Sequence, residues 1–333
     1  MSNPRYIAVK LIDKTLKNAG YSNIQLNSGL ESSEMNERDK KLCSAIFYGV
    51  IERKITLDYI IENRSARPIN KLDSIILNIL RSGVYQILYM ENIPDNAAVS
   101  ESVSLAKSFG KTSASGMVNA ILRNFIRNGK KIQLPKDKLQ AISVEYSVPK
   151  ELVEKLADDY GIELAENLFE DALLKPSTTI RMNSNICDEK KLSESINDTS
   201  IEKSNILPNC YNLGSGDLTK TIGFKNGYFH VQDLASQLCC NVLSPTENDI
   251  VLDICAAPGG KTFTMSEMMN GKGMIYAFDI HEKRVDLIRK GAERLCLTNI
   301  KAECGDATKF NPELPKFTKI LCDVPCSGIG AIR

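Results

Sequence analysis

The 333-residue sequence lacks several common features, and each absence argues against a class of protein. No run of about 18 consecutive apolar residues occurs, so we expect no helix that spans a membrane. The N-terminal segment up to Lys17 mixes charged residues such as Arg5 and Lys10 with apolar ones, which predicts an amphipathic helix and not a secretion signal. The sequence therefore predicts a cytoplasmic protein.

Clustered metal ligands are also missing. The 10 cysteines are scattered without a Cys-x-x-Cys pair, and the 2 histidines, His230 and His281, lie far apart in the sequence. Zinc sites need clustered thiolates or imidazoles, so we expect no metal. Disulfides are not expected in a reducing compartment, and most of the cysteines are interpreted as small buried apolar residues.

Charge is nearly balanced, and the formal net charge of +1 by itself indicates no partner. Its distribution is uneven: residues 1–130 carry 18 Lys/Arg and 12 Asp/Glu, whereas residues 131–333 carry 24 and 29. A positive N-terminal part suits a protein that binds the phosphate backbone of a nucleic acid. A basic surface that contacts only solvent explains the same numbers, and charge alone does not separate the two interpretations.

The first 130 residues have the apolar spacing of helices, which predicts at least five helices and no strand. A polar linker follows at about 130–138. Beyond it we expect helical structure over 150–174, a strand at Thr178–Met182, and a surface helix and loop over 188–204. These elements predict a small mixed α/β module from about 140 to 230.

The pattern changes near Asn248 to strands that alternate with helices, which predicts a parallel sheet. In such sheets, ligands bind beyond the carboxyl ends of the strands, where the strand order reverses. The expected strands are Ile250–Ile254, Met274–Phe278, Ile300–Glu303 and Lys319–Leu321, and the expected helices are Thr262–Met269 and Lys283–Cys296.

The strongest local signal is the segment Ile250–Thr262, in which an apolar strand leads through small residues into a helix. Small residues let a ligand approach the backbone closely, and a helix N-terminus attracts a negative group such as a carboxylate. A nucleotide-triphosphate P-loop is the main alternative, because Gly260-Lys261-Thr262 matches the end of that motif. The P-loop also needs a glycine where this sequence has Cys255, which disfavours it. A purely structural turn is the third interpretation.

Two carboxylates follow the next two expected strands. Asp279 ends one strand, where it can accept hydrogen bonds from both ribose hydroxyls of a nucleoside, and Asp306 follows the other, where it can contact an adenine amine. Either aspartate alone is more often a helix cap or a turn residue. Together, after successive strands, they favour a nucleoside-containing cofactor.

The fourth expected strand leads into Asp323-Val324-Pro325-Cys326-Ser327-Gly328. Asp323 can accept a hydrogen bond from the exocyclic amine of cytosine, and Cys326 offers a possible thiolate. Cytosine C5 is a poor nucleophile until a thiolate adds to C6 and makes it enamine-like, which is covalent catalysis. A buried structural cysteine is the alternative for Cys326.

These motifs together resemble the bacterial 16S ribosomal RNA cytosine-5 methyltransferases known as RsmB or Sun, along essentially the whole chain. The matching segments of the NusB-like part are Glu37-Arg38-Asp39, Leu80-Arg81, Tyr89-Met90, Ile93-Pro94 and Val118–Arg123. Those of the middle and catalytic parts are Tyr146–Pro149, Ile180–Asn183, Val231–Gln237, Cys255–Lys261 and Asp323–Gly328.

The resemblance implies a multidomain protein with an all-α NusB-like RNA-binding domain (1–130), a small α/β RNA-binding module (140–230) and a Rossmann-like methyltransferase domain (231–333). It implies a monomer that acts on 16S ribosomal RNA, with no membrane and no metal. S-adenosylmethionine is the implied cofactor, and the implied site residues are Cys255, Ala256, Ala257, Pro258, Gly259, Gly260, Lys261, Asp279, Asp306 and Asp323. Asp323 and Cys326 are the implied catalytic residues, with Cys326 assisting the breakdown of the covalent adduct.

In the resembling enzymes the attacking cysteine belongs to a Thr-Cys motif that follows the fourth strand by some tens of residues. The present sequence ends at Arg333, so we expect a C-terminally truncated enzyme whose nucleophile lies outside it. A catalytically inactive RNA-binding fragment that retains S-adenosylmethionine binding is the alternative from another class. An ATPase is disfavoured by Cys255 and by the lack of any further nucleotide-hydrolysis motif.

Overall fold

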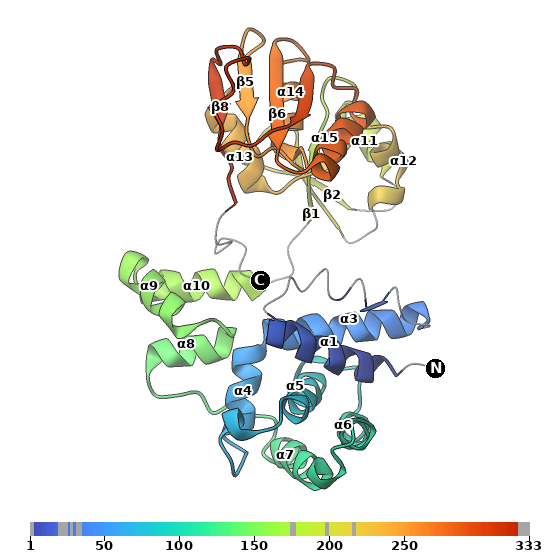
Figure 1. Cartoon of the computed structure of the whole chain (residues 1–333), viewed down its shortest axis with the longest axis vertical. Helices are drawn as coiled ribbons and strands as arrows, with labels where there is room; N and C mark the ends of the chain where they lie inside the picture. Colours follow the sequence, from blue (N-terminus) through green and yellow to red (C-terminus); the bar gives the residue numbers. More distant parts are fainter. Residues whose placement is uncertain are drawn as a thin grey trace. The chain divides into compact units, whose positions relative to one another are not determined.

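The computed structural model describes residues 3–18, 26, 29–30, 35–173, 178–196, 200–214 and 218–325. The chain divides into two compact units at residues 174 and 175, and each is considered by itself (Figure 1). This division differs from the three domains expected from the sequence, whose boundaries lie near 130 and 230. In the described parts of both units, no helix is long and apolar enough to cross a membrane.

The first unit begins with a helical bundle, as predicted. Its core contains large apolar side chains that are fully buried, such as Phe47 and Phe125. The side chain of Asp73 caps the most buried helix by accepting hydrogen bonds from the N–H groups of Ile75 and Ile76. The helices are α1 (Pro4–Asn18), α3 (Glu37–Glu52), α4 (Lys54–Glu62), α5 (Ser74–Tyr89), α6 (Asp95–Ser108) and α7 (Ser115–Arg127).

Three further helices belong to the same unit: α8 (Lys138–Tyr146), α9 (Lys150–Tyr160) and α10 (Ile162–Leu173). The expected helical stretch 150–174 is therefore present but interrupted, because Gly161 adopts a positive φ of 86°. Ser147, which follows α8, accepts a hydrogen bond from the N–H of Ile55 at 3.1 Å, and this contact ties α8 to α4.

The second unit contains an antiparallel sheet of order β2-β3-β1-β4. Its strands are β1 (Thr178–Met182), β2 (Ile201–Lys203), β3 (Cys210–Leu213) and β4 (Phe229–Val231), accompanied by α11 (Glu189–Ser195) and α12 (Ile222–Lys225). The expected strand at Thr178–Met182 and the surface helix within 188–204 are confirmed. The expected loop at the end of that range is wrong, because Ile201–Lys203 is an edge strand. Three residues with two exposed charged side chains carry too little alternation to indicate a strand.

The same unit contains a parallel sheet of order β7-β6-β5-β8, as the alternating pattern predicted. Val251, Ile275 and Ala277 are buried at alternate positions and pack in apolar clusters with residues of the neighbouring helices. From β5 the chain adds β6 and then β7 on one side of the sheet and β8 on the other side, so the strand order reverses between β5 and β8. The strands are β5 (Ile250–Asp253), β6 (Met274–Asp279), β7 (Ile300–Cys304) and β8 (Lys319–Leu321), and the helices are α13 (Leu234–Leu243), α14 (Gly260–Met268) and α15 (Glu282–Arg294).

Candidate active site

The candidate site lies at the carboxyl edge of the parallel sheet, where all four strands end. The loop Cys255–Lys261 follows β5, Asp279 ends β6, Asp306 follows β7 and Asp323 follows β8. Backbone hydrogen bonds join these neighbours: the N–H of Ala256 donates to Phe278 at 2.8 Å, and the N–H of Gly305 donates to Asp279 at 3.0 Å. Parallel pairing therefore gathers residues that are far apart in the sequence along one edge.

The loop has a shape that its small residues make possible. Gly259 has a φ of 111°, and a Cβ atom there would lie 2.3 Å from the ring of Phe263. Only glycine fits this position without displacing that ring. The helix α14 begins at the next residue, and Thr262 in its first turn donates from its hydroxyl to Asp253 at 2.7 Å. The loop is thus held between β5 and α14.

A cavity of about 200 Å³ opens beside this loop, at the carboxyl ends of the paired strands β5 and β8. Its lining includes Asp323 and every residue of the expected loop except Gly259. Two polar atoms of the lining residues, Oδ1 of Asp253 and Nε2 of Gln232, are buried without a hydrogen-bond partner in the described part of the chain. The lining residues are Val231, Gln232, Asp233, Ser236, Asp253, Cys255, Ala256, Ala257, Pro258, Gly260, Lys261 and Asp323.

The segment Val231–Ser236 contributes to the cavity although the sequence prediction assigned it no site residue. Asp233 is the N-cap of α13 and accepts a hydrogen bond from the N–H of Ser236 at 2.8 Å. An aspartate before an apolar helix is a detectable signal for a helix start, but it does not indicate that the cap faces a cavity.

Asp279 and Asp306 lie along the same edge but do not line this cavity. The buried carboxylate of Asp279 accepts a hydrogen bond from the N–H of His281 and lies 3.3 Å from Arg284, which also donates to the carbonyl of Ala257 at 3.0 Å. Asp306 accepts hydrogen bonds from the hydroxyl and the N–H of Thr308, which lower its pKa. Both carboxylates keep lone pairs that these bonds do not use.

Lys261 and Asp323 form an ion pair of 2.6 Å at the cavity. Burial alone would lower the pKa of Lys261, but the hydrogen bond and charge of Asp323 outweigh it and raise that pKa. Lys261 therefore stays cationic and holds the Asp323 carboxylate in place. The expected catalytic residue Cys326 lies outside the described residues, so the structure leaves its placement untested.

Asp253, like Asp279, is almost completely buried at this edge. Burial raises its pKa to about 6, although the hydrogen bond from Thr262 and the charge of Lys261 act in the opposite direction. The residue therefore changes protonation state within a range close to neutrality.

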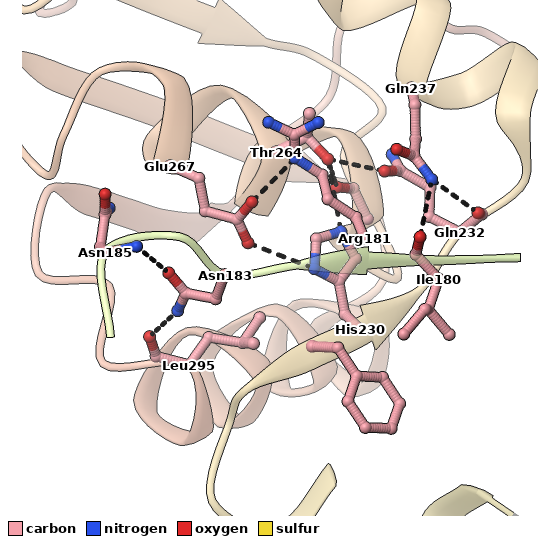
Figure 2. A network of polar contacts seen from close by, with 12 residues as sticks. Ile180, Arg181, Asn183, Asn185, His230, Gln232, Gln237, Thr264, Glu267 and Leu295 are labelled. Carbon is pink, nitrogen blue, oxygen red and sulfur yellow. Dashed lines mark hydrogen bonds and ion pairs between the residues drawn. The ribbon is translucent and has the colours of Figure 1, made fainter. Parts of the chain in front are cut away.

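A buried polar network connects the cavity to the antiparallel sheet (Figure 2). Arg181 of β1 donates from Nε to Glu267 of α14 at 2.8 Å, and both side chains are buried. Glu267 lies 3.4 Å from Nδ1 of His230 on β4, and Nε2 of the same ring contacts the hydroxyl of Thr264 at 3.3 Å. Thr264 also donates to Oε1 of Gln232 at 2.6 Å. The network thereby fixes Gln232 at the wall of the cavity.

The described residues contain no candidate metal centre, because no group of three or more His, Cys, Asp or Glu side chains among them could hold an ion.

Comparisons with known proteins agree with this arrangement. A model of the NusB family matches residues 2–127, and one described as 16S rRNA methyltransferase RsmB/F matches residues 240–333. The chain is 36% identical to the probable ribosomal RNA small subunit methyltransferase B of Bacillus subtilis, over 99% of this chain and 74% of the relative. The chain belongs to this methyltransferase family. A relative of the same name from Synechocystis is 32% identical, over 100% of this chain and 76% of its own.

Solved structures support the fold class. The crystal structure of PH0851 superposes with a TM-score of 0.73 at 21% identity, over 100% of this chain and 76% of that one, which shows a shared fold. A methyltransferase homolog protein from Pyrococcus horikoshii gives a TM-score of 0.54 at 26% identity, over 60% of this chain and 66% of its own. The predicted combination of a NusB-like helical part with an α/β methyltransferase domain is confirmed.

Proposed function

We propose that this protein transfers a methyl group from S-adenosylmethionine to C5 of a cytosine in 16S ribosomal RNA, through a covalent cysteine adduct. The observation that carries the proposal is the cavity at the carboxyl ends of β5 and β8, which is lined by residues of the loop Cys255–Lys261 and by Asp323. It lies at the point of strand reversal, which is where open α/β sheets bind ligands. The names of the curated relatives supply the substrate class.

The residues at this edge fit S-adenosylmethionine. Asp279 offers free lone pairs for two ribose hydroxyls, and Asp306 offers them for an adenine amine. The N-terminus of α14 suits the carboxylate of the methionine part, and the unpartnered Oδ1 of Asp253 suits a donor such as its ammonium group. When bound, the cofactor supplies an electrophilic methyl group on a positively charged sulfur.

The base requires a different set of groups. We assign to Asp323, which Lys261 orients through their ion pair, the acceptance of a hydrogen bond from the exocyclic amine of cytosine. A thiolate adds to C6, C5 takes the methyl group, and the loss of the C5 proton then lets the thiolate leave. The family resemblance assigns this last step to Cys326, and it assigns the attack to a second cysteine in a Thr-Cys motif.

Calorimetric titration of the chain tests the cofactor assignment. S-adenosylhomocysteine, the demethylated product, should bind, whereas ATP should give no heat of binding because the loop lacks the P-loop glycine. Asp279→Ala should weaken binding of S-adenosylhomocysteine at least tenfold, a change of about 1.4 kcal/mol, through the loss of charge-assisted hydrogen bonds. Tight binding of ATP, with no response to the methionine-derived ligand, would reject the proposal.

Transfer of a labelled methyl group tests the reaction, and the assay uses this chain extended by a Thr-Cys segment of the family, which supplies the attacking cysteine. Digestion of labelled 16S ribosomal RNA to nucleosides should place the label in 5-methylcytidine. Label in another nucleoside would still show that the protein is a methyltransferase, but it would contradict the assignment to cytosine C5. Binding of both cofactor and RNA without any label would favour the non-catalytic RNA-binding alternative.

A further inference from the structure

A second hollow, of about 560 Å³, lies on the helical bundle of the first unit, between the end of α4 and α7. Three arginines belong to its lining, together with small and apolar residues, and none of the lining residues is acidic. We call this hollow the arginine cleft; it is lined by Arg64, Ala66, Arg67, Ser113, Ala114, Met117, Ala120, Ile121, Asn124 and Arg127.

Arg64 is a fixed charge in this cleft. Its guanidinium donates to the backbone carbonyls of Ile60 and Lys131, both at 3.0 Å, and lies 4.9 Å from the ring centroid of Phe125. Burial lowers its pKa, but a guanidinium remains protonated at any physiological pH. Because the N–H groups of this guanidinium donate to backbone carbonyls and not to a carboxylate, its positive charge is not neutralised.

Arg67 and Arg127 are exposed, and neither forms an ion pair with a carboxylate in the described part of the chain. Neighbouring cations behave differently: Lys111 pairs with Asp73 at 2.6 Å, and Lys130 pairs with Asp95 at 2.8 Å. The two free arginines therefore add uncompensated charge to that of Arg64.

The sequence around the cleft is also depleted of acid. Residues 102–136 contain no Asp or Glu and 7 Lys/Arg, and residues 63–72 contain no acid either. Residues 131–174, which include α8 to α10, show the opposite bias, with 5 Lys/Arg and 10 Asp/Glu. The excess of positive charge therefore belongs to the segments that contain the cleft residues, although Glu62 next to them accepts a hydrogen bond from the N–H of Ile69. Low-dielectric walls focus the field of charges that line a hollow.

The floor of the cleft is apolar. Met117, Ala120 and Ile121 come from one face of α7, at the spacing of successive turns, and Ala114 precedes that helix. Asn124 adds an amide on the same face. An apolar floor between positive groups suits a single-stranded nucleotide, whose base or ribose covers the floor while its phosphates contact the arginines.

We propose that the arginine cleft binds the phosphate backbone of a single-stranded segment of the RNA substrate. The proposal rests on the proposed function, because it takes the substrate to be RNA. Arg67 and Arg127 provide the phosphate contacts, and Arg64 provides a fixed positive background. An acidic protein segment is the other ligand class that such a cleft could accept, but a rigid guanidinium beside a small apolar floor favours nucleotides.

The test compares two double variants of the 333-residue chain with equal loss of charge. Arg67→Gln/Arg127→Gln removes the two free guanidinium groups of the cleft. Arg38→Gln/Lys41→Gln, the matched control, removes two exposed cations of α3 that do not line the cleft. Affinity for a 16S ribosomal RNA transcript is measured at several salt concentrations, together with the affinity for S-adenosylhomocysteine. Amide hydrogen exchange in α5 and α7 checks that the helical unit is folded in both variants.

The cleft variant should reduce the slope of log affinity against log salt by about 1.4, because each single-strand phosphate that the protein no longer neutralises lowers it by about 0.7. The control should keep the wild-type slope, and both should bind S-adenosylhomocysteine as the wild type does. Equal slopes in the two variants would contradict the proposal that the arginine cleft binds RNA, while leaving the proposed function intact. A wild-type chain that binds S-adenosylhomocysteine but no RNA would reject the RNA part of the proposed function, and the cleft with it.

Discussion

At the scale of single residues, Asp253 makes the stability of the protein depend on pH. Burial raises its pKa from 3.8 to about 6, so the folded state holds the proton more tightly than the unfolded state. Its contribution to stability is therefore greatest below about pH 4 and is lost as the pH rises through about 6. Over that window we expect a loss on the order of 3 kcal/mol.

Urea unfolding of the wild type and of Asp253→Asn at pH 4, 5, 6 and 7 measures this effect. Asparagine can still accept the hydrogen bond from Thr262 but does not ionise. The wild type should therefore lose stability relative to the variant as the pH rises. Parallel pH profiles for the two proteins would contradict the expectation.

Gln232 is expected to act on the cofactor and not on the fold. Its Nε2 is buried without a partner at the cavity, while the Thr264 hydroxyl holds its Oε1 at 2.6 Å. Gln232→Leu should weaken binding of S-adenosylhomocysteine about tenfold, the equivalent of one hydrogen bond of about 1.4 kcal/mol. The thermal midpoint should stay within a few degrees of the wild type. Unchanged affinity together with a large loss of thermal stability would assign Gln232 to the fold alone.

The sequence located the loop Cys255–Lys261 and Asp323, because strand, small-residue loop and helix follow each other within a few residues. Their ligand stays a prediction. Asp253 was not assigned to the site, although it ends β5 just before the loop. Gln232 was not assigned either, since its exposure to the cavity depends on how β4 packs against α14. That packing joins segments about thirty residues apart in the sequence, so no local spacing of residues predicts it.

At the scale of elements, the parallel sheet was predictable because β5 and β6 are short apolar runs, each followed by a turn and a helix. The edge strand β2 was not, since two of its three side chains are charged and exposed. The strand order β2-β3-β1-β4 could not be predicted from the sequence either, because tertiary contacts decide which antiparallel strands pair across long loops.

The buried pair Arg181–Glu267 is expected to hold β1 of one sheet against α14 of the other. Glu267→Gln leaves a buried guanidinium without its counter-charge, which should cost about 3–5 kcal/mol. Arg181→Met/Glu267→Gln removes both charges and should recover much of that loss. Amide hydrogen exchange in β1 and α14 measures the free energies.

Asp159→Asn serves as the control, because it breaks the exposed pair Lys155–Asp159 of 2.7 Å on α9 and should change the exchange protection of α9 only slightly. Equal losses in the buried and the exposed pair would contradict a structural role for the buried one. A double variant that is less stable than Glu267→Gln would contradict the counter-charge argument.

At the scale of the whole molecule, the two proposed binding sites belong to different units. The expected cofactor residues all belong to residues 175–332, and the arginine cleft belongs to residues 1–174. The sequence predicted an excess of positive charge before residue 130 but not its concentration in one hollow. The hollow forms because Arg64 and α7 meet through packing around Phe125.

This division predicts separate footprints for the two ligands in hydrogen exchange. A ligand that binds only the folded state slows the opening of the segments around its site. S-adenosylhomocysteine should therefore protect residues 253–261 and the start of α15, where Arg284 joins Asp279 to the loop. The transcript should protect the end of α4 and α7 without requiring the cofactor.

The informative measurement adds the ligands separately and then together to the same chain. Protection of α7 by S-adenosylhomocysteine alone would place the cofactor, or an effect of it, in the first unit and contradict the division. Protection by RNA that is confined to 175–325 would leave the proposed substrate in place and remove the helical unit from its recognition. Two separate footprints that add when both ligands are present are the expected result, because no described residue lines both the cavity and the arginine cleft.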